Sequence, residues 1–258
     1  MSAELDMGVV FIGDREVGKT ALATELANAR NEYVRVTNHN YEDLKALLYD
    51  AGSDRFRATT LIDDRTLEIE AKLPIGVRKI EVDWIDTPGE IWRKSWQEDN
   101  PDEWRRFLDS ATRSEGIMLL LPPYRECVAE NRRLLQTSVE LDDFITKQQW
   151  CNRFDRWADF FSNFCPKARH IAICMNKADL FCDVGKETEK LAYYPHRSRM
   201  NWMQRHTYVC NTYFKPLLPQ LTEINRKRSG LSVQCFITSA YDRQLLELPW
   251  IYLVSYLA

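Results

Sequence analysis

The chain has 258 residues, of which 45% are hydrophobic and 28% charged, and its net charge is −3. This length fits one large domain with a sizeable core. The small charge excludes a global field that would drive binding to nucleic acid or an anionic membrane. The seven cysteines are scattered, which favours a reducing, cytoplasmic setting. No apolar run reaches the ~18 residues of a membrane span, and no lipid-anchor motif is expected.

The first predicted elements are a strand, a glycine-containing loop and a helix. An apolar run over residues 7–12 predicts a buried strand. The octapeptide that follows, Gly13-Asp14-Arg15-Glu16-Val17-Gly18-Lys19-Thr20, has the G-x-x-x-x-G-K-T form of a phosphate-binding loop. Its backbone N–H groups would form an anion nest at the start of a helix over 19–30, which includes Ala21. Lys19 would reach the β- and γ-phosphates, and the Thr20 hydroxyl would bind Mg²⁺.

The next stretch, residues 31–64, is long and polar for a connection, so we expect a large loop or an added helix over 41–49. Alternating apolar residues then predict an antiparallel hairpin over 67–73 and 80–84, with one wet face near a sheet edge. Asp86-Thr87-Pro88-Gly89 follows this hairpin. A carboxylate at the strand end can hold Mg²⁺, and the Gly89 N–H can meet a γ-phosphate.

Helices and buried strands alternate through the rest of the chain. Asn100 and Pro101 predict the start of a helix that runs to about Ser110. Further helices are expected over 126–164, as one helix or two, and over 202–227 with an interruption near Pro216 and Pro219. Apolar runs predict strands over 117–121, 171–175 and 233–237. The segment 245–258, which Pro249 would break, is either a last helix covering the sheet, a surface for a partner, or the start of a further segment.

Two groups of aromatic residues have a structural and a functional interpretation. The residues of one group recur every three or four positions, as in a stripe on one face of a helix, and the residues of the other group follow Gly89 in the sequence. We expect both to pack in the core, and the alternative is a partner surface. The stripe consists of Trp150, Phe154, Trp157, Phe161 and Phe164, and the second group of Trp92, Trp96 and Trp104.

The tetrapeptide Asn176-Lys177-Ala178-Asp179 directly follows the predicted strand over 171–175. The Asp179 carboxylate can accept hydrogen bonds from guanine N1–H and the exocyclic amine, whereas adenine offers no matching donor pair. Asn176 can bond the purine edge or brace the phosphate loop, and the Lys177 stem can cover the base. Ser239 and Ala240, after the last strand, can close over the guanine oxygen. The motifs therefore indicate a guanine nucleotide.

These four elements, in this order and at strand ends, resemble the Ras-like small GTPases of the P-loop class. The resemblance covers about residues 7–250 and implies a three-layer α/β fold with a six-stranded, mostly parallel, doubly wound sheet and one antiparallel edge strand. It also implies binding of GTP and GDP, dependence on Mg²⁺ and slow hydrolysis. Residues 1–258 would form one such domain, with insertions near 31–64, 91–114, 125–167 and 181–199. Asp86 and Gly89 would belong to its second switch.

The chain departs from that family at three places. The threonine of the first switch, a metal ligand, could be Thr59, Thr60 or Thr66, and the spacing to Asp86 slightly favours Thr66. Glu90 stands where the family usually has glutamine or histidine. Arg15 occupies a position of the phosphate loop where a bulky side chain can obstruct the residue that positions the attacking water. Arg15 either points to solvent, pairs with Glu90, or supplies a positive charge to the γ-phosphate. The leading hypothesis is a slow GTPase switch with a protein effector, the second is a GTP-binding scaffold, and Asp179 disfavours an ATPase.

Overall fold

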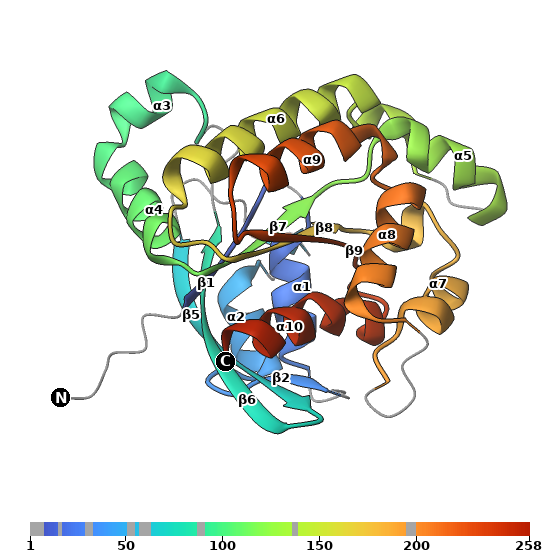
Figure 1. The fold of residues 1–258 in the computed structure, drawn as a ribbon, viewed down its shortest axis with the longest axis horizontal. Coiled ribbons are helices and arrows are strands. Elements are labelled where there is room, and N and C mark those ends of the chain that lie inside the picture. Colours follow the sequence, from blue (N-terminus) through green and yellow to red (C-terminus); the bar gives the residue numbers. More distant parts are fainter. Residues whose placement is uncertain are drawn as a thin grey trace.

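A mixed seven-stranded sheet forms the middle layer of the molecule (Figure 1). The computed structural model describes residues 8–14, 17–28, 33–50, 55–56, 63–86, 91–135, 139–194 and 200–258. The strand order is β2-β5-β6-β1-β7-β8-β9. The bounds are β1 Gly8–Gly13, β2 Val34–Val36, β5 Asp63–Leu73, β6 Gly76–Asp86, β7 Gly116–Leu121, β8 His170–Met175 and β9 Ser232–Ile237. A separate small hairpin pairs β3 (Tyr49–Asp50) with β4 (Arg55–Phe56).

The doubly wound, mostly parallel α/β architecture is confirmed. Strands β6, β1, β7, β8 and β9 are parallel neighbours, and β5 runs antiparallel to β6. The expected count of six strands is wrong, because the short strand β2 pairs with β5 and takes the edge position. The antiparallel strand β5 is consequently internal. With only three residues, β2 is too short to give a periodic sequence signal.

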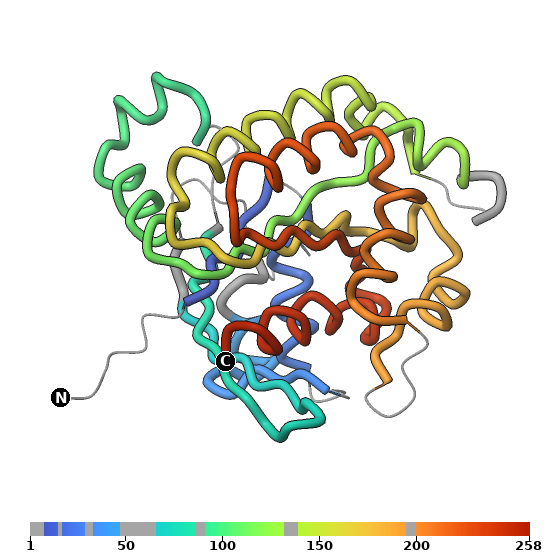
Figure 2. The backbone as a smooth tube through the Cα atoms, in the orientation of Figure 1, coloured from blue at the N-terminus to red at the C-terminus, as the bar shows by residue number. Residues whose placement is uncertain are grey.

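Helices cover both faces of the sheet (Figures 1 and 2). One face carries α1 (Lys19–Leu26), α2 (Tyr41–Leu48) and α10 (Arg243–Leu257), and the other carries α4 (Pro101–Arg113), α6 (Lys147–Phe164) and α9 (Leu218–Lys227). The remaining helices are α3 (Lys94–Asp99), α5 (Arg125–Leu135), α7 (Val184–Leu191) and α8 (Trp202–Thr212). Single 3₁₀ turns are η1 (Leu141–Asp143), η2 (Ala178–Leu180) and η3 (Lys215–Leu217). Because β6, β1, β7, β8 and β9 are parallel, their carboxyl ends meet at one edge of the sheet.

Local sequence signals explain most helix boundaries. Asn100 is the N-cap of α4 and Pro101 its first residue, as predicted, and the helix ends at Arg113 rather than near Ser110. Helix α6 begins with a capping box, in which the Thr146 hydroxyl accepts from the Gln149 N–H. The predicted interruption near Pro216 is confirmed, because η3 separates α8 from α9. The added helix expected over 41–49 is also confirmed as α2.

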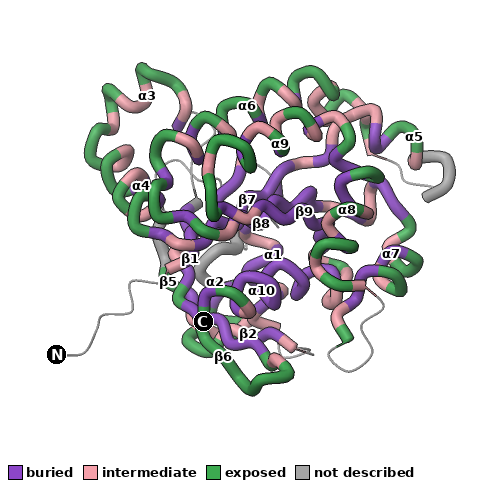
Figure 3. The backbone as a smooth tube through the Cα atoms, in the orientation of Figure 1, coloured by how far each residue is buried: buried purple, intermediate pink, exposed green. Residues whose placement is uncertain are grey.

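Helix α10 is buried on nearly all sides, and this explains its apolar sequence (Figure 3). Residues 245–254 are all buried, so the prediction of a last helix that covers the sheet is confirmed. The expected break at Pro249 is wrong, because the helix continues through it. Proline has no N–H to donate to the preceding turn. Packing of this helix against the sheet and α1 compensates for that missing bond.

The aromatic stripe of α6 belongs to the core, as expected. Trp150, Phe154, Trp157 and Phe161 are buried, and Phe164 at the helix end is 41% exposed. Trp92, from the segment after β6, meets the Trp157 ring edge-on, with 4.6 Å between centroids. Trp92, Trp96 and Trp104 are partly buried against the core. Aromatic packing therefore joins the segment that begins at residue 91, after the Asp86-Thr87-Pro88-Gly89 motif, to α6.

Candidate nucleotide site

The phosphate loop connects β1 to α1 at the carboxyl edge of the sheet. Gly13 ends β1 against β7, and a Cβ atom at this position would lie 2.6 Å from the Leu120 carbonyl oxygen. Gly18 precedes α1 with a φ of 88°, and a Cβ there would lie 2.8 Å from the Asn176 amide nitrogen. Side chains at these two glycines would therefore collide with neighbours. Between them, Val17 is 1% exposed and anchors the loop in the core.

Lys19 folds back over the loop that precedes it. The side chain is 4% exposed, and its Nζ donates to the carbonyl oxygens of Gly13 at 3.0 Å and Asp14 at 3.1 Å. The ammonium group is thus held by two carbonyl oxygens at the amino end of the loop. No acidic residue lies in the first turn of α1, and no side chain caps it. Thr20 and Ala21 stand in that turn, where the helix dipole and N–H groups favour an anion.

The tetrapeptide predicted to bind guanine is assembled around one buried amide. Asn176 is 3% exposed; its Nδ2 donates to the Val17 carbonyl at 2.7 Å. Its Oδ1 accepts from the Thr238 hydroxyl at 3.0 Å. Asn176 therefore joins the phosphate loop to the loop after β9. Of the two roles expected for this residue, its contacts favour bracing the phosphate loop over bonding the purine.

Asp179 lies in η2, and its Oδ1 accepts from the Ser239 hydroxyl at 2.5 Å. The two loops are also joined by the backbone, because the Ala178 N–H donates to the Thr238 carbonyl at 3.0 Å. Ser239 is fully buried, whereas Ala240 is partly exposed and lines a cavity of 520 Å³ together with Ala21. The predicted guanine residues and the start of α1 thus share one region.

Lys177 adopts the left-handed backbone conformation, with φ of 61° and ψ of 45°. This is unfavourable for a residue with a side chain, and it is the one such case among the described residues. Backbone strain of this kind is retained mainly where the surroundings impose a geometry. Lys177 also lines a second cavity, of 830 Å³, with Arg153. At Lys177 the chain changes direction between the end of β8 and the start of η2.

Asp14 forms contacts that the sequence did not predict. The motif indicated only a member of the phosphate loop. Its Oδ1 accepts from the Trp157 indole N–H at 3.1 Å, and its Oδ2 lies 3.7 Å from an Arg153 nitrogen. That Oδ2 is buried without a hydrogen bond, so the second contact is an ion pair beyond bonding distance. Asp14 thus ties the loop to α6. The two partners are separated by 143 positions in the chain, and no local pattern reports such a contact.

The predicted metal residues are only partly described. Asp86 is the last residue of β6, and β6 pairs with β1 in a register that puts Phe11 beside Trp84. Asp86 therefore lies level with Gly13, at the same sheet edge as Thr20. Threonine hydroxyls and carboxylates are hard oxygen donors that suit Mg²⁺. Thr66, by contrast, pairs with Asp83 at the level of Val10.

Thr66 is thus about 10 Å of strand rise away from the edge where Asp86 lies. It is exposed, and its carbonyl accepts from the Asn38 amide at 2.8 Å. The structure does not bring Thr66 together with Thr20. The competing Thr59 and Thr60 lie outside the described residues, as do Arg15, Glu16, Gly89 and Glu90.

Comparisons with known proteins give a distant structural likeness. No protein-family model matches the chain, and no curated protein matches it. Among solved structures, it is similar to a variant of Era from Aquifex aeolicus bound to GDP and AlF4⁻, with a TM-score of 0.44 and 15% sequence identity. The match covers 97% of this chain and 56% of that one, so the chain spans little more than half of Era's length. None of the described helices is long and apolar enough to cross a membrane.

Proposed function

We propose that this protein is a Mg²⁺-dependent GTP-binding protein that hydrolyses GTP slowly to GDP and acts as a nucleotide-controlled switch. The observation that carries this proposal is the position of Asn176. Its amide bonds the phosphate loop on one side and Thr238 on the other, at 2.7 and 3.0 Å. This one side chain thereby joins a loop suited to phosphates to the loop after β9, whose Ser239 bonds the carboxylate suited to guanine. We further propose that it is a Ras-like P-loop GTPase forming one domain with insertions.

The side chains have distinct roles in this proposal. Loop N–H groups and Lys19 bind the phosphates, and the ammonium exchanges its present carbonyl partners for phosphate oxygens. Thr20 and Asp86 would hold Mg²⁺, which neutralises charge on the β- and γ-phosphates. Asp179 accepts the guanine donors, and the Ser239 hydroxyl at 2.5 Å fixes the orientation of that carboxylate. Ser239 and Ala240 close over the base.

Arg15 and Glu90 determine how fast hydrolysis is. Glu90 is proposed to act at the γ-phosphate, where a carboxylate is unfavourable unless it takes a proton or pairs with a cation. Arg15 is proposed to supply positive charge there. The combination favours a slow intrinsic rate. A protein partner that contacts the switch segments in the GTP-bound form, in the cytoplasm, would complete the system.

A GTP-binding scaffold is the alternative, and the tie between the phosphate loop and α6 favours it. Asp14 bonds Trp157, which in turn contacts Trp92. Aromatic packing of this kind restrains the segment that contains Trp92. Such restraint opposes the movement of this segment that a nucleotide-controlled switch would require.

Single-turnover hydrolysis of GTP by the purified protein with Mg²⁺ separates the two functions. The switch requires a rate well above that of GTP in buffer, with Lys19→Ala reduced to background. Tight GTP binding with a background rate would select the scaffold. A protein that binds no guanine nucleotide would reject both functions.

A further inference from the structure

A second cluster of reactive side chains lies away from the nucleotide site, between α8 and the edge strand β9. His206 and Cys210 are one helical turn apart on α8, and Cys235 lies on β9. Their ligand atoms, one from each residue, all lie within 4.8 Å of one another. Among the described residues this is the one group of three such side chains at that spacing. It could hold a metal ion or act through its two thiols.

The hydrogen bond of His206 decides against a metal ion. The Cys235 backbone N–H donates to His206 Nδ1 at 3.0 Å. Because β9 is an edge strand, this N–H, which points away from β8, has no neighbouring strand to bond. The imidazole accepts its hydrogen bond instead. In the neutral ring the proton then resides on Nε2. A metal ion bound at Nδ1 would displace the Cys235 N–H. A metal ion bound at Nε2 would move the ring proton to Nδ1, where it would face the Cys235 N–H, so that two donors would point at each other. Neither ring nitrogen is available as a ligand.

Cys210 differs from every other cysteine of the chain in its ionisation. The Cys235 thiol donates a hydrogen bond to it and lowers the pKa of Cys210 to about 6, and His206 adds to this effect. His206 Nε2 lies 3.5 Å and Nδ1 3.6 Å from the Cys210 sulfur. Burial raises the pKa of the other six thiols. Cys210 is therefore the thiolate of the pair and Cys235 the thiol.

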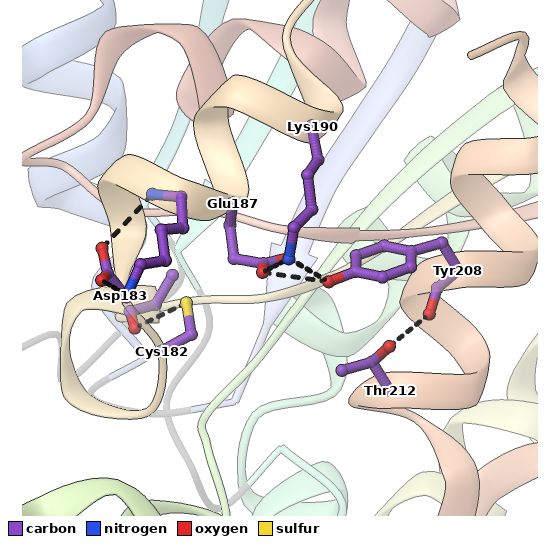
Figure 4. Close-up of polar contacts among 8 residues, drawn as sticks. Cys182, Asp183, Glu187, Lys190, Tyr208 and Thr212 are labelled. Atoms are coloured by element: carbon purple, nitrogen blue, oxygen red, sulfur yellow. Dashed lines mark hydrogen bonds and ion pairs between the residues drawn. The ribbon is translucent and has the colours of Figure 1, made fainter. Parts of the chain in front are cut away.

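Helix α8 is held firmly in front of β9, which keeps the two sulfur atoms close. Tyr208, two positions before Cys210, donates to the buried carboxylate of Glu187 on α7 at 2.8 Å, and Lys190 bonds both groups (Figure 4). On the preceding turn, Arg205 is 3% exposed and donates to the Leu191 carbonyl at 2.7 Å. Disulfide formation thus needs little ordering of the helix.

We propose that Cys210 and Cys235 are a thiol pair that hydroperoxides oxidise reversibly to a disulfide. The Cys210 thiolate attacks the terminal peroxide oxygen, an S–O bond forms, the O–O bond breaks, and hydroxide or alkoxide leaves. Cys235 gives its proton to the departing base and attacks the sulfenic sulfur. The S–S bond forms and the sulfenic oxygen leaves as hydroxide, which takes up from solvent the proton that Cys210 had released on ionisation. The two sulfurs lose two electrons, and the peroxide gains them.

Cysteine mapping of the full chain tests this proposal and does not depend on GTP binding. Reduced protein is treated with one equivalent of hydrogen peroxide and alkylated, and its peptides are identified by mass spectrometry. We expect a Cys210–Cys235 link with the loss of two hydrogen atoms, reversed by dithiothreitol. Cys210→Ser should abolish the link. Cys235→Ser should stop at a sulfenic acid on Cys210 that dimedone traps.

Cys151 provides the matched control, because it is the more exposed thiol but has no cysteine partner. Cys151→Ser should form the 210–235 link at the wild-type rate. Oxidation that begins at Cys151, or peroxide treatment that leaves Cys210 and Cys235 unlinked in the wild-type protein, would overturn the proposal. Stoichiometric Zn²⁺ bound by the wild-type protein and lost in Cys210→Ser would overturn it in favour of a cation site.

Discussion

Removal of the Asn176 side chain is the perturbation that most directly tests how the site is assembled. In Asn176→Ala the Val17 carbonyl loses its donor and the Thr238 hydroxyl loses its acceptor, and both groups are buried. A buried polar group left unsatisfied costs about 1–3 kcal/mol, so two such groups predict a loss of about 2–6 kcal/mol in unfolding free energy. The upper part of that range would unfold a marginally stable domain.

Urea denaturation of the nucleotide-free protein measures this loss, and GTP titration of the folded fraction measures its functional effect. We expect GTP to bind at least about 10-fold more weakly, because the phosphate loop is no longer held in its binding geometry. Asn163→Ala is the matched control, since Asn163 is exposed and its amide bonds only the Asp159 carbonyl one turn earlier on α6. A change of less than about 0.5 kcal/mol is expected there. An Asn176→Ala protein with wild-type stability and GTP affinity would show that Asn176 does not hold the two loops together.

The loop glycine, a buried ion pair and two charges proposed to act on the nucleotide can each be tested by one substitution. Gly18→Ala should lose at least about 1–2 kcal/mol in denaturation, because its φ of 88° disfavours a side chain and the added Cβ would also lie 2.8 Å from the Asn176 amide nitrogen; an unchanged midpoint would contradict this. Glu247, 1% exposed, pairs with Arg243 and accepts from the Tyr33 N–H. Arg243→Met should therefore cost about 3–5 kcal/mol, while Arg226→Met on the exposed end of α9 should have no measurable effect. Asp179→Asn should shift base preference from guanine to xanthine nucleotides in competition binding, and unaltered preference would count against the assignment. Arg15→Ala should change the single-turnover GTPase rate, and an identical rate would remove Arg15 from the mechanism.

The elements predicted best from the sequence are those specified by nearby residues. The strand before the phosphate loop, the helix that begins at Pro101 and the interruption near Pro216 all follow from residues within one or two turns. Apolar periodicity and proline positions are local quantities, and each has one dominant structural meaning. The order of these elements then limited the fold to a doubly wound sheet.

Long-range contacts could not be predicted in the same way. The edge strand β2 has three residues and forms only because β5 offers unpaired backbone groups. Pro249 lies inside a helix because the surrounding core outweighs its local penalty. The bond from Trp157 to Asp14 and the approach of Cys210 to Cys235 depend on how α6 and α8 are placed on the sheet. Tertiary packing decides these features, and a single sequence carries no direct record of it.

Competition between GTP and ATP for the purified wild-type protein, with Mg²⁺ present, measures whether the site selects guanine. A carboxylate that must be paired rejects a base lacking the matching donors, so GTP should bind at least about 100-fold more tightly than ATP. Equal affinities for the two nucleotides, or no binding of either, would contradict the assignment of Asp179 and of the site around Asn176.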